Sequence, residues 1–234
     1  MQPEKSYTCK NNSFLCNLRF YFLNKPAVKT LVEYKTPEDR KLFGRRILSQ
    51  LGVSVDEYSV LNIHKIGIEV PVKDVFEELL HWDGNSNYWP NKIARVKRID
   101  GNLENIFIFM LGIEKLKFRW LNGKSIRVKP LFNLNALKFQ YSSSPADDHN
   151  ARYLLYECSG GYPIGIFSLY ARESIPEENE MHQTQLFSLV AFNFYGKKHW
   201  FYSKIINPVW EKIHNKVTTN VLNRMKTEFE SKFY

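Results

Sequence analysis

The chain has 234 residues, 44% of them hydrophobic and 24% charged, a composition that excludes a disordered, collagen-like or fibrous protein and fits one globular domain with an appendage. It has no run of about 18 uncharged apolar residues, so we expect no transmembrane helix. Its 3 cysteines are too few and too scattered for a disulfide framework, which indicates a reducing compartment, the cytoplasm.

The net charge of +9 is concentrated in the middle of the chain. Residues 91–130 contain ten basic and three acidic residues, a local net charge of +7. A surface of this kind makes polyanionic partners worth testing.

We predict that residues 1–55 form an N-terminal extension with one helix near residues 37–50. Thr36 can cap this helix, Pro37 suits its first position, and Gly52 follows its end.

A long strand is predicted for residues 58–70, where apolar residues recur at every second position until Pro71. A short helix over residues 72–81 follows it.

The middle of the chain then reads as a series of strands. The clearest alternation lies at residues 114–120, where Leu116, Phe118 and Trp120 share one face and three basic residues share the other. We expect one antiparallel sheet that spans residues 58–195, with these further strands: 93–99, 105–111, 126–128, 137–141, 151–158, 163–172 and 183–195.

The last part of the chain is predicted to be a long amphipathic helix that begins near residue 198, is perturbed at Pro208 and runs to Tyr234. Its apolar residues form a slowly drifting stripe that must pack on an apolar surface. These residues are Ile206, Trp210, Ile213, Val217, Val221 and Met225.

This order of elements predicts an α+β helix-grip fold, with a curved antiparallel β-sheet wrapped around a long C-terminal α-helix. It resembles the START-like superfamily, which includes the Bet v 1-like and polyketide cyclase-like (SRPBCC) proteins. The resemblance rests on residues 63–82, the YWP segment at 88–90 and residues 207–226. It implies a domain over residues 56–234, with a cavity between sheet and helix that holds a hydrophobic small molecule or lipid.

Side chains on the inward parity of the strands and on the helix stripe are the candidate ligand-binding residues. The polar ones among them either hydrogen-bond to structural partners or bind the polar end of a ligand. The candidates are His64, Trp120, Phe139, Tyr153, Glu157, Phe192, Trp210, His214 and Val217.

No metal, cofactor or catalytic residue is predicted. The six histidines contain no pair at i and i+4, and the cysteine spacing matches no zinc pattern. The chain has no G-x-S-x-G motif, and Cys158 has no evident base near it in sequence.

Three kinds of function remain open. The first is a binding or carrier protein for a hydrophobic small molecule or lipid. The second is a cyclase, dehydratase or hydrolase-type enzyme that uses the same cavity and at least two of His64, Glu157 and His214 as acid or base. The third is an interaction module that docks on anionic membrane or nucleic acid through a basic sheet face.

The basic sheet face is predicted on the outward parity of neighbouring strands. A solvated face is the commonest explanation of such an arrangement, and docking on an anionic membrane or nucleic acid is the alternative. Few aromatic residues share this parity, which disfavours single-stranded nucleic acid. The face consists of Lys115, Lys117, Arg119, Arg127 and Lys129.

Overall fold

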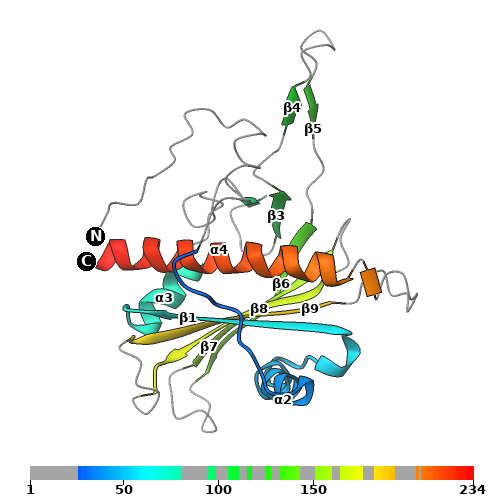
Figure 1. The fold of residues 1–234 in the computed structure, drawn as a ribbon. Coiled ribbons are helices and arrows are strands. Elements are labelled where there is room, and N and C mark those ends of the chain that lie inside the picture. The colour runs from blue at the N-terminus through cyan, green and yellow to red at the C-terminus, as the bar shows by residue number, and fades with distance from the viewer. Residues whose placement is uncertain are drawn as a thin grey trace.

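The structure is a computed structural model of the chain. It describes residues 26–80, 94–98, 105–110, 115–117, 125–127, 132–142, 151–159, 164–175, 182–192, 204–205 and 207–234. The helices in these residues are α2 (Pro37–Leu48), α3 (Val72–Leu80) and α4 (Asn207–Phe233), with the short 3-10 turns η1 (Ser49–Leu51) and η2 (Val55–Glu57) (Figure 1). The strands are β1 (Val60–Ile68), β2 (Ala94–Arg98), β3 (Asn105–Met110), β4 (Lys115–Lys117), β5 (Ser125–Arg127), β6 (Phe132–Ser142), β7 (Ala151–Ser159), β8 (Ile164–Glu173) and β9 (Thr184–Phe192).

The main sheet has seven antiparallel strands in the order β1-β9-β8-β7-β6-β3-β2. The first described strand therefore pairs with the last one, in a register that runs from Val60 opposite Phe192 to Ile68 opposite Thr184. This pairing leaves β1 at one edge of the sheet and β2 at the other.

The hairpin β4–β5 is separate from this sheet. Among the strands that the structure describes, β4 and β5 pair with each other alone, with Lys115 opposite Arg127 and Lys117 opposite Ser125. The prediction of one sheet over residues 58–195 is therefore wrong for this hairpin. Alternating apolar and charged residues specify a strand, but they do not specify its neighbour.

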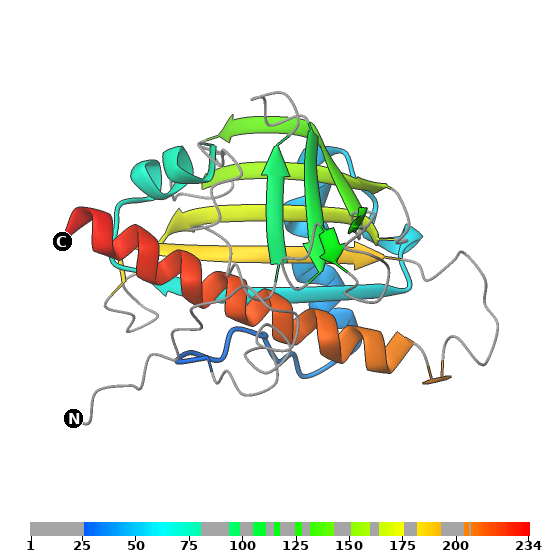
Figure 2. The ribbon, with the colours of Figure 1, turned by 90° about the horizontal axis from the view of Figure 1, so that it is seen from above.

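Two helices cover the same face of the main sheet, which we call the inner face. α4 packs on β1, and α3 packs on β7, β8 and β9 (Figure 2). The sheet curves, and its β6–β3–β2 side bends over the inner face in this view. The fold is thus an α+β helix-grip fold, as predicted, with α4 along the β1 side of the sheet.

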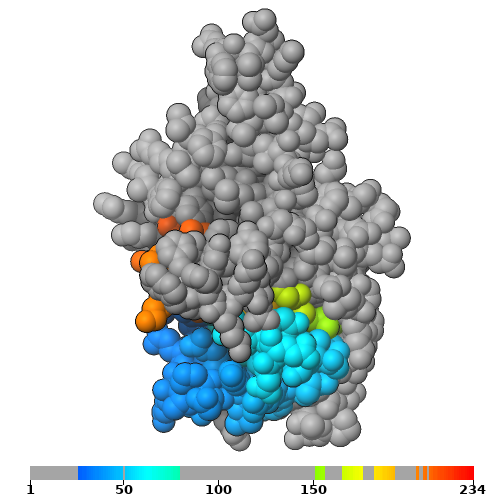
Figure 3. All heavy atoms as spheres, turned by 90° about the vertical axis from the view of Figure 1, so that its right-hand side faces the viewer, coloured from blue at the N-terminus to red at the C-terminus, as the bar shows by residue number. Residues whose placement is uncertain are grey.

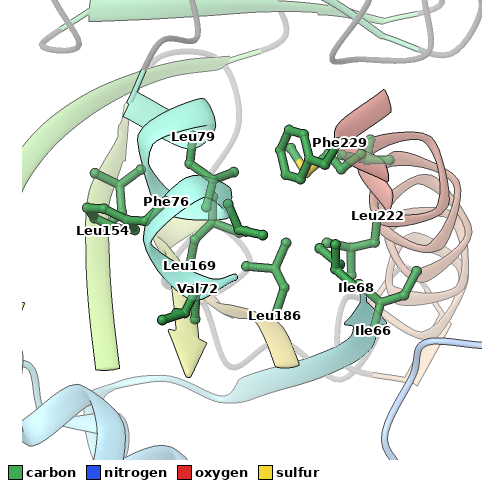
Figure 4. Close-up of a cluster of buried hydrophobic side chains, with 14 of the residues drawn as sticks. Ile66, Ile68, Val72, Phe76, Leu79, Leu154, Leu169, Leu186, Leu222 and Phe229 are labelled. Carbon is green, nitrogen blue, oxygen red and sulfur yellow. The ribbon is translucent and has the colours of Figure 1, made fainter. Parts of the chain in front are cut away.

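The core of the inner face lies between the two helices and the sheet. Leu79 of α3 lies toward Phe229 of α4, and Phe76 of α3 lies beside Leu154 of β7 (Figure 4). These four side chains are buried together with Leu222 of α4. Because Leu222, Met225 and Phe229 are three and four residues apart, they share one face of α4. This face sets the orientation of the helix on the sheet.

The outer face of the sheet is also apolar, because α2 covers it. Ile47 and Leu48 of α2 are buried in a cluster with Ile63 of β1 and with other strand residues. A Cβ atom on Gly44 would lie 2.7 Å from the Leu61 side chain, so this glycine lets α2 approach β1 closely. Figure 3 shows residues 26–50 in blue beside residues 51–80 in cyan on this side of the molecule.

A strap formed by residues 28–32 closes part of the β1 edge. The Val32 N–H donates to the Ile63 carbonyl (2.9 Å), and the Lys65 N–H donates to the Thr30 carbonyl (2.7 Å). The Asn223 side chain of α4 holds the start of the strap, since it accepts from the Val28 N–H and donates to the Val28 carbonyl, both at 2.8 Å. The strap thus joins β1 to α4.

The helix ends follow local sequence signals. The predicted helix near residues 37–50 is confirmed as α2, and a capping box starts it: the Asp39 N–H donates to Thr36 Oγ1 and the Thr36 N–H donates to Asp39 Oδ2, both at 3.1 Å. α4 begins at Asn207, so Pro208 stands in its first turn. The backbone N–H groups of the first turn have no partner within the helix, so the missing N–H of Pro208 costs no hydrogen bond there. The prediction that Pro208 perturbs the helix is therefore wrong.

Candidate functional site

Polar side chains interrupt the apolar inner face where β1 and β9 meet α4. Asn62 and His64 of β1 and Ser188 of β9 are each at most 1% exposed. His64 lies opposite Ser188 and Asn62 lies opposite Val190, so Asn62 and Ser188 are diagonal neighbours on one face. We call these three residues the inner polar cluster.

His64 connects β1 to the strap and to α4. Its Nε2 atom lies 3.1 Å from Oδ1 of Asn215, and because an amide oxygen only accepts, Nε2 carries the proton and donates. The other ring nitrogen, Nδ1, is hydrogen-bonded to the Thr30 hydroxyl, 2.9 Å away. Thr30 Oγ1 also lies 2.9 Å from Thr219 Oγ1 of α4. Both ring nitrogens are therefore already hydrogen-bonded.

Two histidines at this site are neutral at pH 7. Burial lowers the pKa of His64 to about 4, and the hydrogen bond from His64 to Asn215 opposes this shift only in part. Burial, together with the nearby His64, lowers the pKa of His214 to about 4. Nδ1 of His214 lies 3.3 Å from the Thr218 hydroxyl one turn further along α4. The site therefore holds two uncharged imidazoles.

Asn62 and Ser188 differ from His64 in their hydrogen bonding. Neither the amide nitrogen nor the amide oxygen of Asn62 has a partner among the residues that the structure describes, and the same holds for Ser188 Oγ. A buried polar atom without a partner costs about 1–3 kcal/mol, so most such atoms in native proteins are paired. These three buried atoms therefore have hydrogen-bonding capacity that no described residue uses.

Apolar side chains adjoin the inner polar cluster. Val190 and Phe192 of β9 are buried in the inner core, and Val217 of α4 packs against it. The rings of Phe192 and His214 lie 6.2 Å apart between centroids. Apolar walls with a few placed polar groups are typical of small-molecule sites.

The structure brings four of the predicted ligand-binding residues to this region: His64, Phe192, His214 and Val217. Among the described side chains of the predicted stripe on α4, Ile213 differs from the prediction, because it is 36% exposed. The contacts of Leu222, Met225 and Phe229 with the sheet rotate the helix so that its inward face includes His214 and Thr218 instead.

Tyr153 lies on the opposite side of the sheet, so its predicted place in the cavity is wrong. Its ring stacks on that of Tyr170, with 4.9 Å between centroids, in the cluster beneath α2. The prediction that Tyr153 lies on an apolar face of β7 is correct. Both faces of the sheet are apolar, however, and the alternation along a strand does not say which of them meets α4.

The other candidates are placed only along the backbone. Phe139 of β6 pairs with Leu154, Glu157 of β7 pairs with Ile166, and Trp210 belongs to α4. Trp120 lies outside the described residues. Their roles in ligand binding stay predictions.

Several residues of the site were not among the sequence candidates: Thr30, Asn62, Ser188, Asn215, Thr218 and Thr219. Asn62 gave a signal, because it is a polar residue between the apolar residues of a strand. Thr30 and Asn215 gave none, since they reach His64 from positions 34 and 151 residues away in the chain.

The described residues limit the chemistry of the site. They contain no group of three His, Cys, Asp or Glu side chains that could hold a metal ion. Both ring nitrogens of His64 are already hydrogen-bonded, one to Thr30 and one to Asn215, so neither is free to act as a general base. None of the helices in the described ranges is long and apolar enough to cross a membrane. The geometry favours binding over proton transfer at His64.

Comparisons with known proteins add only weak likenesses. No family model and no curated protein matches the chain. An uncharacterized protein from Bacillus thuringiensis is similar in structure at 11% identity and a TM-score of 0.41, over 73% of this chain and 98% of that one. Ara h 8.0201 (9% identity, TM-score 0.39, 74% and 98% covered) is another similar structure. A third is truncated norcoclaurine synthase from Thalictrum flavum, at 9% identity and a TM-score of 0.36, over 69% of this chain and 91% of that one.

Likenesses at this level of identity and TM-score carry no argument about function. The fold therefore rests on the elements described above, and the function on the site.

Proposed function

We propose that this chain is a START-like helix-grip protein that binds an apolar small molecule or lipid between the inner face of its sheet and α4. The observation that carries the proposal is Asn62, a fully buried amide whose two polar atoms have no partner in the described part of the chain. A ligand that hydrogen-bonds to Asn62 would offset the cost of burying it.

The surroundings of Asn62 support this proposal. Ser188 offers a hydroxyl as a second polar group on the same face, and Val190 and Phe192 offer apolar surface next to it. A site of this composition binds the body of a ligand by apolar contact and orients the ligand through one polar group.

Native mass spectrometry of the full chain, purified from its own cells, tests the proposal directly. We expect an adduct of a small apolar molecule that is released on denaturation. A chain that carries no such molecule, and that binds no apolar probe in solution, would contradict the proposal.

Two buried serines on neighbouring strands provide a matched comparison. Ser188 of β9 lies in the inner polar cluster, whereas Ser168 of β8 lies opposite Leu189 of the outer cluster. The hydroxyls of both are buried and have no partner among the described residues. We expect Ser188→Ala to weaken binding of the retained molecule and Ser168→Ala to leave it unchanged. Equal effects of the two substitutions would place the ligand elsewhere.

A further inference from the structure

The inner polar cluster is uncharged, and this limits the kind of ligand that it can hold. The side chains that surround Asn62 on β1, β9 and α4 are amides, hydroxyls, apolar groups and the imidazoles of His64 and His214. Burial keeps both imidazoles neutral at pH 7, since it lowers the pKa of each to about 4. Neither supplies a positive charge to an anionic ligand.

The charged residues on the same elements have access to water. They are half-buried or exposed, and they carry both signs. Those nearest in sequence to His64 and Asn215 are Lys65 on β1, and Glu211, Lys212 and Lys216 on α4. No fully buried cation among the described residues of β1, β9 or α4 would pair with a carboxylate beside Asn62.

The hydrogen-bonding groups suit a neutral partner. The Asn62 amide offers donors and an acceptor, and the Ser188 hydroxyl offers one donor as well as an acceptor. An alcohol can donate to the amide oxygen and accept from the amide nitrogen or the hydroxyl, and a ketone or amide can accept from both. A carboxylate or an ammonium would lose its hydration without an ion-pair partner, a cost that exceeds that of burying a neutral group.

We propose, resting on the proposed function, that the ligand of this site bears an uncharged hydrogen-bonding head group, such as a hydroxyl, which binds to Asn62 and Ser188. The site discriminates against anionic and cationic amphiphiles of the same length. Asn62 is the residue that determines this specificity.

Three probes that differ only in the head group test this inference: 1-decanol, decanoate and decylammonium. Each is titrated calorimetrically into the full chain at pH 7.5. We expect decanol to bind at least about tenfold more tightly than either charged probe. We expect Asn62→Leu, which removes the amide at similar volume, to reduce this preference to less than about threefold. Ser168→Ala should keep the preference of the unaltered chain.

The possible outcomes separate the inference from the proposed function. Tighter binding of decanoate or decylammonium than of decanol would overturn the inference and leave a ligand-binding protein. A preference for decanol that survives in Asn62→Leu would overturn the assignment to Asn62. If none of the three probes binds, and native mass spectrometry finds no adduct, both the inference and the proposed function are wrong.

Discussion

Nε2 of His64 and Oδ1 of Asn215 lie 3.1 Å apart, and this hydrogen bond joins the edge strand β1 to α4. Removal of the amide would leave the buried Nε2–H of His64 without its acceptor. We therefore expect Asn215→Ala to lower the free energy of unfolding by about 1–3 kcal/mol.

Urea denaturation at pH 7 measures this effect. Lys212→Ala is the matched control, because Lys212 is exposed on the same helix. Its free energy of unfolding should change by no more than about 0.5 kcal/mol. Equal stability of the two variants would show that the hydrogen bond to His64 contributes nothing.

The stability of the protein should fall in mild acid. Burial lowers the pKa of His64 from 6.5 to about 4, so between these values the unfolded chain binds more protons than the folded one. The free energy of unfolding therefore decreases as the pH falls through this window, by about 2 kcal/mol between pH 7 and pH 5 for His64 alone. His214 acts in the same direction, because its pKa is also lowered to about 4.

Urea titrations at pH 7 and pH 5 measure this dependence. His64→Gln retains a polar side chain that does not titrate, so it should show a smaller loss of stability between the two pH values. A loss as large as that of the unaltered chain would assign the pH dependence to other groups.

Two phenylalanines one turn apart on α4 test how the helix packs. Phe229 is fully buried in the inner core, whereas Phe233 is 46% exposed. We expect Phe229→Ala to cost about 3–5 kcal/mol of unfolding free energy, because it leaves a cavity between α3 and α4. Phe233→Ala should cost much less. A small effect of both substitutions in thermal or chemical unfolding would contradict the placement of α4 on the sheet.

Docking on an anionic membrane stays a prediction, now placed on the hairpin β4–β5. This hairpin carries Lys115 and Lys117 opposite Arg127 and Ser125, while Arg119 and Lys129 lie outside the described residues. Each basic side chain near an anionic surface contributes about 1 kcal/mol, screened by salt. Reversal of the charges of Lys115, Lys117 and Arg127 should therefore abolish flotation with phosphatidylserine liposomes at low salt.

A variant with the same net charge controls this experiment. Reversal of Lys73, Lys204 and Lys212, which are exposed on other elements, should leave flotation largely intact. Equal losses in both variants would indicate a general charge effect, and preferential capture of a short RNA competitor would favour nucleic acid instead.

The sequence predicts elements well where the signal is local. The Thr36 cap and Pro37 place the start of α2, and Pro71 directly precedes α3, after β1 has ended at Ile68. These features depend on backbone groups a few residues apart, so the chain need not be folded for them to be recognised. The order of such elements was sufficient to predict the helix-grip fold.

The choice between the two faces of the sheet is not local. Phe192 and Tyr153 each belong to a set of alternating apolar residues in their strand. Phe192 nevertheless packs in the inner core, whereas Tyr153 packs on the other face, beneath α2. All nine residues of β9 are buried, so this strand has no polar parity that would identify an outer side. The position of α2 identifies the outer face, and α2 lies outside the predicted domain of residues 56–234.

The strap has a consequence for association between chains. β1 is an edge strand, and an open edge offers its backbone N–H and carbonyl groups to any extended segment of another chain. Thr30 and Val32 already occupy these groups at Lys65 and Ile63. Protection against edge-to-edge aggregation is therefore encoded in a short stretch ahead of the helix-grip domain, so a truncation designed to isolate that domain would expose the edge that the strap covers.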